Sequence, residues 1–183
     1  MSDSEIIKLC KDIYRKHKTA LDLIYEHRPD QQAEIYDFLL GLINSNPDLV
    51  LDHSTKSYIR FIPSDWEIPN LKKSKGWTPS KLIILFEFTN SANSLRLKIT
   101  IGPGPIEIRQ KLLDMALQND PPLHSPYQTL NQMYNNIYTR SVLSPKDYEI
   151  KEIDELTTEI KEKWANFIAH ELPDIQRVMM AGS

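Results

Sequence analysis

The sequence predicts an α+β fold, in which one antiparallel sheet is flanked by helices. Residues 95–101 alternate strictly between apolar and polar side chains, as a half-buried strand requires. Residues 82–88 form a second apolar segment close enough in the chain to pair with the first. Both ends of the chain carry apolar residues at helical spacing. We therefore expect an antiparallel sheet of three to five strands, flanked by an N-terminal helix hairpin and a long C-terminal helix.

The N-terminal segment indicates two helices. The first covers residues 4–27, and its apolar face consists of Ile6, Cys10, Ile13, His17, Ala20 and Ile24. Pro29 ends this helix, Asp30 can cap the second one, and the second closes near Pro47. The two helices are expected to pack as a hairpin. Cys10 is the single cysteine, and its place on the apolar face predicts a buried structural thiol.

Two strands are expected before the central pair. Residues 48–52 predict a short strand. Residues 56–62 show a clearer strand pattern, because apolar and polar side chains alternate there. Residues 63–80 contain three prolines and two tryptophans, which indicates a long irregular connection.

The two central strands are expected to form a hairpin. If residues 89–94 are the loop, one register pairs the apolar residues as Phe88 with Leu95, Phe86 with Leu97, Ile84 with Ile99 and Leu82 with Ile101. In that register Glu87 lies opposite Arg96 on the outer face of the sheet.

The remaining elements follow a tight turn at residues 102–105. This Gly-Pro-Gly-Pro sequence lacks the donors of a phosphate loop, so it indicates a strand-to-helix turn with Gly104 as N-cap and Pro105 as first helical residue. Residues 134–143 predict a last strand, and residues 144–147 a capped helix start. We expect Pro173 to break or kink the final helix.

Length and composition favour a single domain. The chain has 183 residues, of which 40% are hydrophobic, and this is enough for one core. The longest apolar run covers residues 82–86, far short of the ~20 residues of a membrane span. The N-terminus also lacks the basic region of a signal peptide. We therefore expect a soluble, cytoplasmic protein with no membrane partner.

Charge is distributed unevenly along the chain. Residues 1–55, 56–111 and 112–183 carry net charges of −4, +6 and −5, although the total is only −3. A basic sheet region between acidic flanks offers a surface for phosphate groups, because the local field depends on nearby charges. The alternative is that the lysines of residues 72–81 only solvate a loop.

Five sequence runs carry a resemblance to a known family. They are ALDLIY (20–25), KSYIRFIP (56–63), FEF (86–88) with LRLK (95–98), IGPG (101–104) followed by EIR (107–109), and LPDI (172–175). In this order they resemble the C-terminal region of bacterial proteins assigned to the PD-(D/E)XK nuclease superfamily. In that group the nuclease core and its divalent metal lie upstream. The resemblance therefore implies that residues 1–183 are the C-terminal accessory domain of a longer nuclease-type protein.

The residues themselves show no nuclease site. That chemistry needs acidic metal ligands and a lysine two positions beyond the second acid on one strand. Glu87 is on a predicted strand, but Thr89 stands at the lysine position. Glu149 and Lys151 have the spacing only at a predicted helix entry. We therefore expect no catalytic residue, no metal ligand and no cofactor in this chain.

Two functional hypotheses remain open for such an accessory domain. The first is DNA binding by the outer sheet face, with cations on phosphates and rings on bases, through Lys56, Tyr58, Arg60, Trp66, Arg96 and Lys98. Against it stands the fact that antiparallel sheets commonly have one charged, wet face. The second is an assembly or free-standing interaction module that binds an upstream nuclease domain, a second copy or another protein. Its contact would be the loop with Trp66 and Trp77 or the acidic C-terminal helix.

Overall fold

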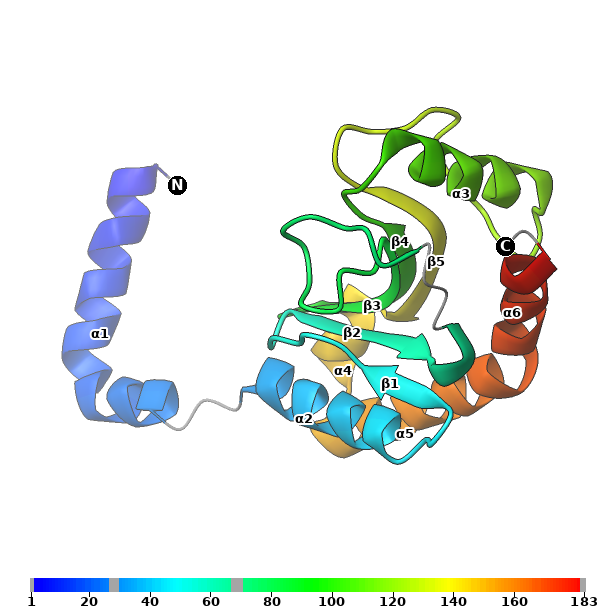
Figure 1. The fold of residues 1–183 in the computed structure, drawn as a ribbon. Coiled ribbons are helices and arrows are strands. Elements are labelled where there is room, and N and C mark those ends of the chain that lie inside the picture. The colour runs from blue at the N-terminus through cyan, green and yellow to red at the C-terminus, as the bar shows by residue number, and fades with distance from the viewer. Residues whose placement is uncertain (1, 27–29, 67–70, 182–183) are drawn as a thin grey trace. The chain divides into compact units, whose positions relative to one another are not determined.

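A computed structural model describes residues 2–26, 30–66 and 71–181 (Figure 1). The chain divides into two compact units, Met1–Asp30 and Gln31–Ser183. The sheet and the hydrophobic core belong to the second unit. Within the described ranges, no helix is at once long enough and apolar enough to cross a membrane.

The first unit is the helix α1, Asp3–Glu26, which confirms the helix expected here. It bends at His17, where φ is −122° and ψ is 25°. No described residue of α1 is buried, because a single helix has no second element in its own unit to cover its apolar face. Cys10 is exposed, so the prediction of a buried thiol is wrong. The expected packing of α1 against the second helix stays a prediction.

The second unit is built on a five-stranded antiparallel sheet, which confirms the α+β class. Its strands are β1 Leu49–Leu51, β2 Tyr58–Pro63, β3 Ile84–Ser91, β4 Ser94–Ile101 and β5 Asn135–Leu143. They lie side by side in chain order, so every strand pairs with its neighbours in sequence. Two register irregularities between β4 and β5 add local bending.

The hairpin of β3 and β4 has the predicted faces but a different register. Phe86 pairs with Ile99 and Phe88 with Leu97, two residues away from the predicted partners. The strands continue to Ser91 and Ser94, so the turn between them is shorter than the expected loop. A shift of two residues keeps every side chain on its face. The apolar set is therefore buried as predicted.

Helices α2 and α5 cover the core face of the sheet. Figure 1 shows α2, Gln31–Asn44, and α5, Ile153–Asn166, running along the same side, and both contact strands. Beneath them Phe61 stacks on Phe86 with ring centroids 5.2 Å apart, and Trp164 meets Phe61 edge-on at 5.6 Å. This aromatic cluster fills the centre of the core.

The C-terminal helices follow β5 without a long connection. Ser144 and Asp147 form a capping box at the start of α4, Pro145–Ile150, as predicted. After α5, a π-helical turn at Phe167–Glu171 leads into α6, Leu172–Ala181. Pro173 lies in the first turn of α6, and the wider π turn before it accommodates the missing N–H donor. The helix therefore changes to a π-helical turn just before this proline, and α6 follows without a break.

Helix α3, Ile106–Gln118, lies between β4 and β5 in the chain and has Pro105 as its N-cap, one position beyond the predicted Gly104. Its Arg109 is buried and donates to the carbonyl oxygens of Asn131 at 2.8 Å and Gln132 at 3.2 Å. Burial lowers the pKa of this guanidinium. Arg109 therefore fastens the loop before β5 to α3.

Candidate functional site

The outer face of the sheet brings together most of the residues proposed for DNA contact. Strand pairing aligns Arg60 in β2 with Glu87 in β3 and Lys98 in β4. The neighbouring row aligns Tyr58 with Arg96 across Thr89. Because paired residues and residues two apart share a face, all of these side chains lie on one side of the sheet.

Arg60 is held by three contacts on this face. Its Nε donates to the Glu87 carboxylate at 2.7 Å, and both side chains are largely buried. Its guanidinium carbon lies 5.2 Å from the ring centroid of Tyr58 and 5.8 Å from that of Trp77. Glu87 therefore pairs with Arg60 on the adjacent strand, which corrects the prediction of Arg96. An Arg60 charge already neutralised in this way is a poor phosphate ligand.

Trp66 lies away from this surface. It belongs to the short 3-10 helix Ser64–Trp66, is 2% exposed, and packs 5.2 Å from Phe86 in the core. The structure therefore corrects the grouping of Trp66 with the outer-face residues. Lys56 is exposed just before β2, Arg96 is exposed, and Lys98 is half-buried.

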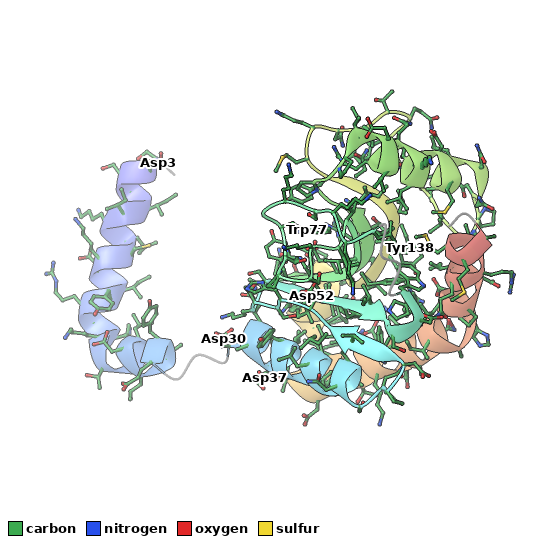
Figure 2. The ribbon with its side chains drawn as sticks, viewed as in Figure 1. Asp3, Asp30, Asp37, Asp52, Trp77 and Tyr138 are labelled. Carbon is green, nitrogen blue, oxygen red and sulfur yellow. The ribbon has the colours of Figure 1, made fainter. Side chains whose placement is uncertain are left out.

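Two aromatic residues that the sequence analysis did not place on this face complete it. The rings of Trp77 and Tyr134 meet edge-on at 5.7 Å, and Trp77 also covers Arg60. Figure 2 labels Trp77 on the connection between β2 and β3. No pattern in the sequence points to the position of Trp77, but the structure shows why Gly102 follows β4. A Cβ atom there would overlap the Trp77 ring, so only glycine leaves room for it.

The connection that carries Trp77 is fastened to the sheet. Ser80 donates to the Asp52 carboxylate at 2.5 Å and lies 3.0 Å from the Thr78 hydroxyl. The Ser74 N–H donates to the Lys81 carbonyl at 2.7 Å, and Ile83 N–H to Leu71 at 2.8 Å. These bonds hold an otherwise irregular segment, so the position of Trp77 is supported from both sides.

Other polar clusters in the second unit have structural partners. Lys151 binds Asp147 at 2.6 Å and also pairs with Glu159, and the hydrogen bond from Lys151 holds the pKa of Asp147 well below its usual value. Tyr138 donates to Glu171 at 2.5 Å, and burial raises the pKa of this phenol. Within the described ranges, His, Cys, Asp and Glu nowhere gather in a group of three able to hold a metal ion.

The apolar face of α1 is a second candidate surface. Large apolar side chains on this helix are between 44% and 82% exposed, namely Ile6, Ile7, Leu9, Ile13, Tyr14, Leu23, Ile24 and Tyr25. The core of the second unit is formed by residues of its own strands and helices, among them Ile35 of α2, Phe61 of β2 and Trp164 of α5.

Comparison with known proteins gave no relative for this chain: no family model, no curated protein and no solved structure matches it.

Proposed function

We propose that this chain is a non-catalytic accessory module that mediates assembly, and that α1 provides the contact. The observation that supports this function is the apolar face of a 24-residue helix that has no covering element in its own unit. Exposed apolar surface of this extent in a soluble protein is typical of an interaction site.

A second copy of the chain is the partner that we propose for this contact. Soluble oligomers are most often symmetric homodimers, in which the same surface of each chain meets its equivalent. An amphipathic helix satisfies this requirement readily, because its apolar face is complementary to itself. The resemblance to the C-terminal region of nuclease proteins is consistent with such a role, since an accessory region can pair the subunits of a cutting enzyme.

The mass of the full chain in solution tests this function. We expect light scattering to give a mass that rises with concentration from 21.3 kDa towards twice that value. Ile13→Asp, on the apolar face, should keep the chain at the monomer mass. The matched control is Thr19→Asp, which adds the same charge at an exposed position outside the helical face of Ile6, Ile13 and Ile24, and should leave the dimer intact. A monomer mass for the unaltered chain at every concentration would refute the proposal.

A further inference from the structure

We infer that the outer face of the sheet binds single-stranded nucleic acid, with Tyr58 and Tyr134 as stacking surfaces and Arg96 and Lys98 as phosphate ligands. This inference is independent of the assembly function, because it uses only residues of the second unit.

The stacking surfaces are built as a continuous ladder. Tyr58 lies against the Arg60 guanidinium, which lies against Trp77, which meets Tyr134. The ion pair with Glu87 fixes the guanidinium in the middle of this ladder. The residues at its two ends, Tyr58 and Tyr134, are 42% and 44% exposed. A rigid, exposed ring loses little entropy when a base stacks on it, which makes such rings effective anchors.

Cations lie beside the ladder on the same face. Arg96 is in the same cross-strand row as Tyr58, two strands away, which corresponds to about 10 Å. Lys98 occupies the equivalent place in the row of Arg60. The connection that carries Trp77 adds exposed lysines, including Lys73 and Lys75. A strand that stacks on a tyrosine can therefore bring its backbone within reach of positive charge.

The acidic groups described on this face are already engaged. Glu87 accepts from Arg60, and Asp52 accepts from Ser80 and from the backbone N–H of His53. The charge of Glu87 is therefore compensated by Arg60, Asp52 is hydrogen-bonded, and Arg96 and Lys98 of β4 supply basic side chains on this face.

Exposed rings favour a single strand over a duplex. The faces of the bases in a duplex are covered by their neighbours, so they are not open to a tyrosine ring. In a single strand the bases can separate and stack on aromatic side chains with little regard to sequence. Duplex binding would use only the cations of this surface.

Fluorescence anisotropy with a labelled oligothymidine tests the inference on the full chain. We expect binding at low salt that is tighter than binding of a duplex of the same length. Tyr58→Ala and Tyr134→Ala should each weaken it about tenfold. Arg96→Ala should lower the salt dependence of the logarithm of the binding constant by about 0.7.

Matched controls lie elsewhere on the second unit. Tyr127→Ala removes a ring that is also 40% exposed, and Lys161→Ala removes an exposed charge of α5. Neither should change the affinity by more than a small factor. The inference fails if the oligothymidine does not bind at low salt, if the duplex binds at least as tightly, or if Tyr58→Ala behaves like Tyr127→Ala.

Discussion

At the scale of single residues, the ion pair of Arg60 and Glu87 has a structural role, because both side chains are largely buried. The sequence places both on strands but does not say which strands are neighbours. Once β2 lies beside β3, the two side chains face each other across one row and neutralise each other. The ion pair therefore stabilises the sheet. It also holds the Arg60 guanidinium between the rings of Tyr58 and Trp77.

Removal of one partner of this pair should be costly. Glu87→Gln leaves the Arg60 guanidinium largely buried without its counter-charge, so we expect the free energy of unfolding to fall by about 3 kcal/mol. The double variant Arg60→Met with Glu87→Leu removes both charges and should lose much less. Denaturation with urea measures both changes. Equal losses in the single and double variants would show that the ion pair itself contributes the stability.

The facing of side chains could be predicted from the sequence, but pairing could not. Strict alternation in residues 95–101 fixed the face of Leu97, and pairing of the apolar residues with that strand then placed Phe86 on the same face. The partner of each residue depended on the length of the turn after Ser91, and a shift of two residues leaves the faces unchanged. Likewise, Trp66 and Trp77 lie in one proline-rich connection, and only the fold sends one to the core and the other to the outer face.

At the scale of elements, two glycines in different surroundings test the packing of the Trp77 connection. Gly102→Ala would force its methyl group into the Trp77 ring, so we expect a loss of about 1 to 3 kcal/mol and a changed tryptophan fluorescence. Gly41→Ala is the matched control. It lies in α2 with open space around it, and should raise stability by about 0.5 to 1 kcal/mol. A neutral Gly102→Ala would contradict the described position of Trp77.

The start of α4 should make stability depend on pH in acid. Hydrogen bonds from Lys151 and Ser144 lower the pKa of Asp147 in the folded chain below its unfolded value of about 3.9. The carboxylate therefore stabilises the fold above about pH 4, and this contribution is lost as pH falls towards the folded pKa. Asp147→Asn should flatten the acid limb of stability measured by thermal unfolding. An unchanged limb would contradict this assignment.

Helix boundaries near proline show a limit of sequence analysis at this scale. Pro173 predicted a break or a kink, because it lacks a donor and clashes with the preceding turn. The π-helical turn Phe167–Glu171 absorbs the disturbance and lets α6 continue. The capping box of α4 was predictable, by contrast, because its two residues interact locally.

At the scale of the whole molecule, the sequence did not indicate that the chain divides into two compact units. Apolar periodicity predicts an amphipathic helix at the N-terminus, and α1 confirms it. The same periodicity cannot say which surface covers the apolar face, because a core and a partner chain select the same residues. The candidate site was partly predictable for the same reason: its strand residues follow from alternation, and Trp77 and Tyr134 do not.

Hydrogen exchange of the full chain at low and high protein concentration tests the central claim, that α1 is an assembly contact. An isolated helix frays, so its amides exchange rapidly unless its apolar face is covered. We expect the amides of α1 to become protected as concentration rises, while those of β3 and β4 are protected throughout. If the α1 amides are protected equally at every concentration, one chain covers its own helix. If they are unprotected at every concentration, nothing covers it. Either result would contradict the claim.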